Sequence, residues 1–345
     1  MSALLQACGV SKQYEAGAGL WGGRRVCALT GFSIEFDDER PSFVGLVGES
    51  GSGKTTACRL LLGFIHPTEG SVRYRERDLR SLDGETRMRF RREVQAVFQD
   101  PFETFNPFYR VNHCLAAAVR GFRLASSRRE EAGLIEEALV ATGLDPAEVL
   151  GRYPHELSGG QRQRVMVARA LLVGPKLVIA DEPVSMIDAS LRASILAVCR
   201  SLYSRRGICF LYITHDLTTA GQVCESILVL YRGRTVEVGP ADEVIGRPAH
   251  PYTQELIASI PDPEPGSGWL EGLREAPEED DEETRCGCPY LTRCAQAERQ
   301  CGRQVPPLFR TAGRSVAACW LCERFGKARD EEVRAAARAC GKGGA

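Results

Sequence analysis

The chain has 345 residues, 43% hydrophobic and 26% charged, enough for one large core and a second small module. Its 44 basic and 45 acidic side chains nearly cancel, so it lacks the basic excess that draws proteins onto nucleic acid or anionic lipid. The sequence shows neither a secretory signal pattern nor a run of 18 apolar residues. We therefore expect a cytoplasmic chain that meets a membrane only through a partner.

Residues 42–214 show the pattern of a parallel sheet. An apolar run at 42–47 ends in a glycine-rich turn, and helical spacing begins at Lys54. Residues 129–142 carry apolar side chains at helical spacing. Short apolar runs at 177–180 and 209–214 end abruptly in polar residues, as buried parallel strands do. An α/β fold with a helical insert is the simplest account.

The second half contains a hairpin, a linker and a tail. Apolar runs at 227–231 and 235–238 flank Arg-Gly-Arg, a compact hairpin signal. Residues 261–284 are rich in proline, glycine and acidic side chains, which predicts a linker. Residues 326–345 match no motif, and we expect at most a frayed helix there.

A phosphate-binding loop is predicted at residues 48–55, which read GESGSGKT between a predicted strand and a predicted helix. Glycines let successive N–H groups surround phosphate oxygens, Lys54 adds a charge for the β and γ phosphates, and the Thr55 hydroxyl suits Mg²⁺. A glycine-rich turn that binds nothing fits the flanking elements poorly. The predicted nucleotide-binding residues of this segment are Gly48, Glu49, Ser50, Gly51, Ser52, Gly53, Lys54, Thr55 and Thr56.

Two further segments carry candidate chemistry. The strand at 177–180 delivers Asp181, suited to hold magnesium, and Glu182, suited to polarise an attacking water. Such a pair is often only a chain end or a helix cap, but the upstream loop favours the catalytic interpretation. Residues 157–161, LSGGQ, open another predicted helix. They could bind an anion or serve as an ordinary N-cap through Ser158, and no local argument separates the two.

The order GESGSGKTT, LSGGQ and VIADE resembles the ABC ATPase family. This resemblance implies a P-loop NTPase cassette with a parallel-sheet core, an antiparallel β subdomain and a helical subdomain at about 100–170. It also implies that two cassettes pair head to tail, with each ATP held between the phosphate loop of one and the signature segment of the other. That segment is Ser158, Gly159, Gly160 and Gln161.

Further family positions can be matched one by one. Gln99 resembles the glutamine that touches magnesium and couples to the membrane partner, and His215 resembles the histidine that contacts the γ phosphate. Tyr14 resembles the aromatic residue that stacks on adenine, and Asp188 resembles the aspartate that communicates between cassettes. The resemblance thus implies catalytic roles for Lys54, Glu182 and His215, and magnesium ligation by Thr55, Gln99 and Asp181.

One segment departs from the family. Residues 184–188 read VSMID in place of the commoner TSALD. The aspartate and one serine remain, so we expect hydrolysis to be retained. Some asymmetry between two paired cassettes is compatible with the change.

Three stretches resemble the oligopeptide and dipeptide importer branch: FQDPFETFNP at 98–107, YPHEL at 153–157 and HPYT at 250–253. The insert at 17–25 and the sequence of residues 157–164 resemble those of the second of the two cassettes in such importers. The resemblance covers about residues 1–325. It implies a nucleotide-binding domain at 1–260, a linker at 261–284, an extension at 285–325 and a tail at 326–345.

The expected partners are a second, non-identical cassette, two transmembrane permeases and an extracytoplasmic peptide-binding protein, with no nucleic acid. The expected location is the cytoplasmic face of the inner membrane. Nickel, opines or sugars stay open as alternative cargo. A soluble ABC ATPase acting on nucleic acid or ribosomes would need a second cassette or a long coiled-coil insertion, and a non-catalytic regulatory cassette would lack Lys54, Glu182 or His215.

Half of the 14 cysteines fall in the last 60 residues. Four of them are separated by five, six and seventeen residues and resemble the importer extension. Irregular spacing in a loop-rich segment favours a [4Fe-4S] cluster over zinc, which prefers paired C-x₂₋₄-C knuckles, with plain thiols as a further alternative. Cys286 and Cys322 could compete as ligands, and the family's histidine before the last cysteine is missing. The predicted ligands are Cys288, Cys294, Cys301 and Cys319.

Overall fold

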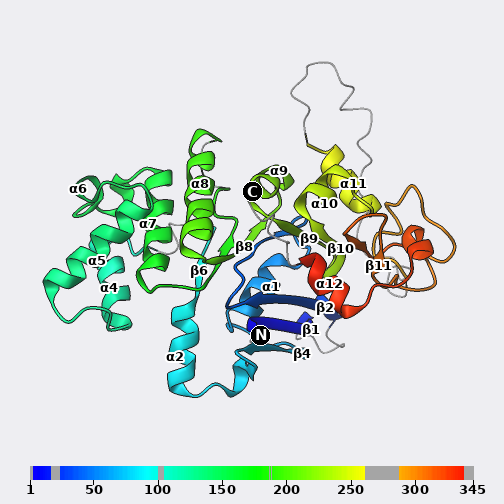
Figure 1. Ribbon diagram of the computed structural model, residues 1–345, viewed down its shortest axis with the longest axis horizontal. Helices are drawn as coiled ribbons and strands as arrows, with labels where there is room; N and C mark the ends of the chain where they lie inside the picture. Colours follow the sequence, from blue (N-terminus) through cyan, green and yellow to red (C-terminus); the bar gives the residue numbers. More distant parts are fainter. Residues whose placement is uncertain are drawn as a thin grey trace.

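The computed structural model describes residues 3–16, 24–99, 105–185, 187, 189–260 and 287–337. Within them the chain forms two sheets (Figure 1). A four-stranded antiparallel sheet has the order β2-β1-β4-β5, and an eight-stranded sheet has the order β11-β12-β10-β9-β3-β8-β7-β6. The first sheet comprises β1 (Ala3–Ala16), β2 (Arg24–Asp37), β4 (Glu69–Tyr74) and β5 (Arg77–Asp78).

The centre of the larger sheet is parallel. β3 pairs in parallel with β8 and β9, and β7 pairs in parallel with β6 and β8. β10 returns antiparallel to β9, as the predicted hairpin requires. The predicted strands in this sheet are confirmed to within two residues at each end. The bounds are β3 (Phe43–Val47), β6 (Val94–Val97), β7 (Leu177–Asp181), β8 (Cys209–Thr214), β9 (Ser226–Tyr231) and β10 (Arg234–Pro240).

Helices flank the sheet in two groups (Figure 1). The predicted helical insert is confirmed, because α4 to α7 form a helical group between β6 and β7 in sequence. Its members are α4 (Val111–Gly121), α5 (Arg128–Ala141), α6 (Pro146–Val149) and α7 (Gly159–Leu172). The other helices are α1 (Lys54–Leu61), α2 (Gly84–Glu93), α8 (Ala189–Arg206), α9 (Leu217–Val223), α10 (Ala241–Gly246), α11 (Pro251–Ala258) and α12 (Asp330–Ala337).

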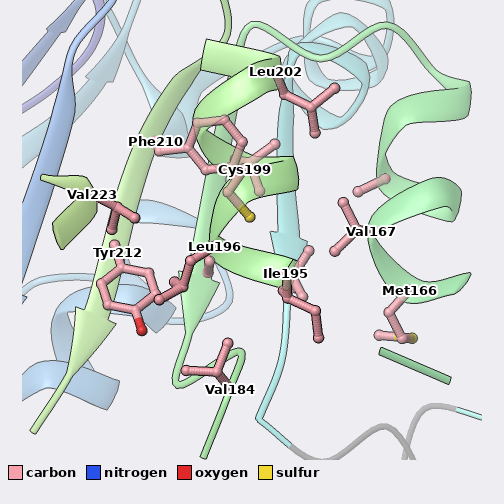
Figure 2. Close-up of a cluster of buried hydrophobic side chains, with 14 of the residues drawn as sticks. Met166, Val167, Val184, Ile195, Leu196, Cys199, Leu202, Phe210, Tyr212 and Val223 are labelled. Atoms are coloured by element: carbon pink, nitrogen blue, oxygen red, sulfur yellow. The ribbon is translucent and has the colours of Figure 1, made fainter. Parts of the chain in front are cut away.

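A hydrophobic core joins the helical group to the sheet. Figure 2 shows side chains of α7 and α8 in one cluster with those of β8, with Cys199 beside Phe210. Phe43 of β3 stacks on Phe210 of β8 with ring centroids 4.8 Å apart. The five-residue strands β3 and β7 are buried almost throughout, so their apolar runs are explained by helices on both faces.

The Cys-rich module, residues 287–325, continues the larger sheet. Its short strands β11 (Phe309–Arg310) and β12 (Val316–Ala317) pair with each other, and β12 pairs with β10. A 3₁₀ helix at Trp320–Phe325 follows. The module therefore rests on the edge of the core sheet through backbone hydrogen bonds.

The helix expected in the tail is present at residues 330–337, but it is packed against the fold rather than frayed. They form α12, which packs against β10, β2 and β9. Ala336 is 5% exposed, and the Ser226 hydroxyl donates to the Ala337 carbonyl at 2.6 Å. The apolar positions Val333, Ala336 and Ala337 share one helix face. A pattern of only three small residues is easily overlooked in a tail rich in alanine and arginine. Among the described residues, no helix has the length and apolar character needed to cross a membrane.

Candidate functional site

The glycine-rich loop at residues 48–55 connects β3 to α1 and is closely packed. Gly53, the residue before α1, has φ 106°, and a Cβ there would lie 2.5 Å from the Ala28 carbonyl oxygen. A Cβ on Gly48 would lie 2.2 Å from the Leu230 carbonyl oxygen. A side chain at either position would collide with backbone, so these two glycines are explained by the close approach of β2 and β9.

Lys54, the first residue of α1, turns its ammonium back over the loop. Its Nζ donates to the carbonyl oxygens of Gly48 at 2.6 Å and Glu49 at 2.8 Å. Burial lowers the pKa of Lys54, while the carboxylates of Glu182, Asp181 and Glu49 act to raise it. The lysine charge therefore lies within electrostatic reach of the two carboxylates at the end of β7.

Ser52 gives the loop an open hydrogen-bonding position. Its Oγ is buried and has no hydrogen-bond partner among the described residues. A buried hydroxyl without a partner costs free energy unless a ligand satisfies it. Together with the N-terminus of α1, which has no side-chain cap, this atom fits an anionic, oxygen-rich ligand such as a nucleotide phosphate.

The predicted acidic pair lies beside the loop. Asp181 ends β7, and burial, followed by the neighbouring Glu182 charge, raises its pKa, while Lys54 acts to lower it. Glu182 has φ 46°, an uncommon conformation for a non-glycine residue, and its N–H donates to the Ile213 carbonyl at 2.8 Å. Such strain is maintained only when the surroundings fix it. The turn therefore holds the Glu182 carboxylate in one place.

His215, which follows β8, completes this group. Its Nδ1 lies 2.9 Å from Glu182 Oε1, so the two side chains are hydrogen-bonded. The histidine ring is 59% exposed and the Glu182 side chain 15%. The pair thus combines a fixed carboxylate with a histidine that is open to an arriving ligand.

The structure also brings Tyr14 and Gln99 to this side of the sheets. Tyr14 pairs with Val26, two residues before Ala28, whose carbonyl lies against Gly53. Gln99 follows β6, next to the strand that ends at Asp181, and is exposed. Thr55, in the first turn of α1, is exposed and Thr56 is half-buried. Ser50 and Gly51 are exposed on the loop.

The signature segment lies apart from these residues. Ser158 is the N-cap of α7, its Oγ accepting from the Gln161 N–H at 3.2 Å while its own N–H donates to Gln161 Oε1 at 3.0 Å. The N-cap interpretation is therefore confirmed as a local role. Gly159 is half-buried, and Gly160 lies against Leu191. Figure 1 shows α7 with the helical group, away from α1. Asp188 lies outside the described residues.

Sequence reasoning missed two residues that hold the loop from the far end of the chain. Tyr252 of α11 accepts a hydrogen bond from the Glu49 N–H at 3.0 Å, and Arg293 of the Cys-rich module binds both carboxylate oxygens of Glu49. The contacts span 203 and 244 residues of sequence, and no motif spacing reports them. Tyr252 lies in HPYT at 250–253, a stretch whose sequence indicates only a resemblance to peptide importers.

The four predicted cysteines meet at one cavity. Cys288, Cys294, Cys301 and Cys319 line a small space of about 10 Å³, together with His250 of the α11 N-cap. Cys322 is buried beside Cys319 but does not line this cavity, and Cys286 lies outside the described residues. The selection of four cysteines out of seven therefore agrees with their convergence in the structure.

The thiols do not form a ready-made mononuclear site. Among the described residues, no group of three or more His, Cys, Asp or Glu side chains is arranged to hold a metal ion. One zinc ion needs all its sulfurs about 2.3 Å from a single point, whereas a cluster places iron and sulfide between them. The donor type and convergence fit a cluster, but the free space is small, so the thiol side chains would have to turn outward to admit it.

Comparisons with known proteins agree with this geometry. Residues 32–185 match the family model described as ABC transporter, and residues 236–301 match that described as oligopeptide/dipeptide transporter, C-terminal region. A putative peptide import ATP-binding protein of Brucella ovis is 36% identical over 92% of this chain and 97% of its own length. The di/tripeptide transport ATP-binding protein DppF of Pseudomonas aeruginosa is 36% identical over 94% of this chain and 99% of its own.

A solved structure supports the fold assignment. An ATP-binding cassette in a dimeric, post-hydrolysis state bound to ADP and Pi superposes with a TM-score of 0.59 at 26% identity, covering 69% of this chain and 98% of that one. The match therefore takes in almost all of that cassette and about two thirds of this chain. The chain therefore belongs to the ATP-binding proteins of ABC transporters, the ABC ATPases, in the group that carries the oligopeptide/dipeptide transporter C-terminal region.

Proposed function

We propose that this chain is the ATP-hydrolysing motor subunit of a peptide importer. The observation that carries the proposal is the contact between Glu182 and His215 beside the Lys54 loop, in a chain that also has the peptide-transporter C-terminal region. Relatives that match nearly the whole chain are named as peptide import proteins. ATP is the substrate that the site around the loop binds and hydrolyses, and the peptide is the cargo that the partner proteins carry.

The described side chains suggest how hydrolysis proceeds. The Lys54 ammonium, with two of its N–H groups on the loop carbonyls, would offer its third to the β and γ phosphates, where its charge offsets the developing negative charge. Glu182 would orient a water and accept its proton as the water oxygen attacks the γ phosphorus and the bond to the ADP oxygen breaks. His215, bonded to Glu182, is placed to contact the γ phosphate. Tyr14 would stack on the adenine.

Magnesium is the expected companion of the triphosphate. It would neutralise charge between the phosphates when bound. Thr55 at the start of α1, Asp181 at the end of β7 and Gln99 after β6 supply the oxygen donors that this ion prefers. Their positions on neighbouring element ends support this assignment.

A second cassette is needed to complete the site. Ser158, Gly159, Gly160 and Gln161 lie with the helical group rather than beside Lys54, which supports a role against the nucleotide of a partner cassette. We propose the same interface for Asp188. The dimeric state of the solved relative supports such pairing.

We further propose the domain organisation and surroundings of the chain. Residues 1–260 form the nucleotide-binding domain, 261–284 the linker, 285–325 the extension and 326–345 the tail. Two permeases, a non-identical second cassette and an extracytoplasmic peptide-binding protein complete the importer, and the chain lies at the cytoplasmic face of the membrane. The names of the relatives support peptide cargo.

For the cysteine cavity we propose a [4Fe-4S] cluster held by Cys288, Cys294, Cys301 and Cys319. Their convergence supports it, and the irregular spacing favours it over zinc. Purification without oxygen should give brown protein with about four irons and four acid-labile sulfides per chain. Colourless protein without labile sulfide would refute the cluster. One zinc ion per chain would instead identify the cavity as a zinc site.

The importer proposal is tested by purifying the chain from its native membranes in mild detergent and identifying what accompanies it. We expect two multi-span permeases, a second cassette and a peptide-binding protein, and the same set with a Glu182→Gln variant. Recovery of ribosomal or DNA-associated proteins without permeases would overturn transport while leaving the ATPase.

A further inference from the structure

The phosphate loop is held from outside by residues of the carboxyl-terminal third of the chain. The Arg293 guanidinium donates to both oxygens of the Glu49 carboxylate, at 3.0 Å each. The Arg293 side chain is 19% exposed. The Glu49 side chain is 41% exposed, so the pair is partly buried. Its bidentate geometry makes it stronger and more directional than a single-contact surface ion pair. Glu49 is thus fixed by a residue 244 positions away.

The backbone of Glu49 is held by a second contact from the same direction. Its N–H donates to the hydroxyl of Tyr252, a residue with no exposed surface. The Tyr252 ring packs against those of Tyr231, with centroids 4.4 Å apart, and Tyr290, 5.6 Å apart. The amide and the carboxylate of one loop residue are therefore both fixed.

Arg293 is itself fixed in place. It also pairs with Glu255 of α11, which in turn accepts a hydrogen bond from the Tyr290 hydroxyl. The guanidinium lies over the ring of Tyr290 at 5.6 Å and that of Tyr231 at 5.8 Å. Stacking and charged hydrogen bonds together limit the rotamers of this arginine.

What Glu49 determines is the position of the catalytic lysine. The Glu49 carbonyl accepts from Lys54 Nζ at 2.8 Å and from the Ser52 N–H at 3.2 Å. Both donors belong to the phosphate-binding loop. Displacing Glu49 therefore moves the oxygen on which the lysine ammonium rests and the turn that carries Ser52.

We propose that Arg293, supplied by the Cys-rich module, is a positioning residue for ATP binding that acts through Glu49 on Lys54. The inference rests on the ATP site proposed above and adds to it a connection between the module and the loop. Arg293 contacts the loop, not the nucleotide. The module is then required for full ATP affinity and not only for folding.

The test is a double-mutant cycle on the full chain, with binding of Mg²⁺ and a fluorescent ATP analogue as the readout. Arg293→Gln and Glu49→Gln should each weaken binding by about three- to tenfold. The double variant should bind no worse than the weaker single variant, because each substitution removes the same contact. Arg293→Lys should fall between wild type and Arg293→Gln, since lysine cannot bind bidentately.

Arg314→Gln is the matched control. Arg314 is also an arginine of the module, but its ion-pair partners are Glu243 and Asp242 on α10 rather than a residue of the phosphate loop. This variant should bind the nucleotide as wild type does. Thermal unfolding of every variant shows whether a loss of binding is a loss of fold. Tyr252→Phe keeps the buried ring, removes only the hydroxyl, and should weaken binding in the same direction.

A kinetic readout separates positioning from mere structure. In the assembled transporter, Arg293→Gln should raise KM for ATP and leave kcat near wild type, because it removes binding common to ground and transition states. A structural role would reduce the active fraction, lowering kcat at unchanged KM. Wild-type affinity in Arg293→Gln, or fully additive losses in the cycle, would overturn the inference. Absence of ATP binding in wild type would instead overturn the proposed function.

Discussion

The nucleotide site and the cysteine cavity are built in opposite ways. Lys54, Asp181 and His215 stand at the ends of a helix and two strands of one sheet. The four cysteines come from a segment whose regular structure is limited to two-residue strands and a 3₁₀ turn. Regular elements fix a site by backbone hydrogen bonds, whereas a loop-built site depends on what its side chains bind. The nucleotide site should therefore keep its geometry when no ligand is bound, whereas the geometry of the cysteine cavity should depend on what the cavity binds.

The electrostatics of the two regions differ in the same sense. In the nucleotide site burial lowers the pKa of Lys54 and raises that of Asp181, and each opposite charge counteracts the other's shift. The charges there are therefore partly balanced by their neighbours. In the cavity burial raises the pKa of Cys288 to about 11 and that of Cys319 to about 12. These thiols are neutral at pH 7 unless a cation offsets the desolvation.

The largest effect should come from the regular site. Glu182→Gln should lower ATP turnover of the assembled transporter by about 10²- to 10⁴-fold, because an amide cannot accept the proton of the attacking water. ATP binding, measured with the fluorescent analogue, should persist. Glu137→Gln, which alters an exposed carboxylate of α5, is the control. Normal turnover in Glu182→Gln would show that Glu182 does not act as the base, and would contradict the catalytic role proposed for the nucleotide site.

His215→Ala should have the next largest effect. It removes the ring whose Nδ1 lies 2.9 Å from Glu182 Oε1, and we expect turnover to fall by about a hundredfold. His66→Ala, at an exposed histidine, should leave turnover unchanged. Equal rates for the two variants would show that the contact with Glu182 has no catalytic consequence.

The cavity should respond in stability rather than rate. Cys288→Ser places a hydroxyl in a buried apolar setting and should lower the free energy of unfolding by about 1 to 3 kcal/mol even without metal. Cys27→Ser, at an exposed cysteine, should be neutral. Chemical denaturation measures both. A Cys288→Ser protein as stable as Cys27→Ser would contradict the dependence of the loop-built region on its sulfur atoms.

The smallest expected effect concerns α12, which packs against β10, β2 and β9. Hydrogen bonds from the Arg329 N–H and from the Arg310 and Arg329 side chains lower the pKa of Glu332 from 4.5 to about 2. A carboxylate with a lowered folded pKa stabilises the fold above pH 4.5, and this contribution is lost as pH falls towards 2. Glu332→Gln should therefore melt slightly below wild type at pH 7, with the gap narrowing below pH 4.5. A gap independent of pH would contradict this assignment.

Local patterns predicted the parallel strands of the larger sheet well. The apolar runs before Gly48 and Asp181 became β3 and β7, because buried parallel strands are nearly uniform in composition. The positions of Glu182 and His215 followed from strand ends. Their direct hydrogen bond did not, since it depends on the left-handed backbone of Glu182.

Contacts between distant segments could not be predicted. Nothing in the spacing of Arg293 or Tyr252 points to Glu49, because tertiary packing alone brings them together. The docking of α12 was also missed, since three small apolar residues in an alanine- and arginine-rich tail give a weak periodic signal. The cysteine set was identified by spacing and resemblance, while its closed cavity required the fold.

The most direct test of the account is equilibrium binding of Mg²⁺ and a fluorescent ATP analogue to the wild-type chain and to Lys54→Ala, with Arg314→Gln as the control. We predict saturable binding to wild type and to Arg314→Gln, and at least about tenfold weaker binding to Lys54→Ala, because a buried charge facing the phosphates is removed. Equal binding by wild type and Lys54→Ala, or no binding by either, would contradict the assignment of residues 48–55 as the ATP site.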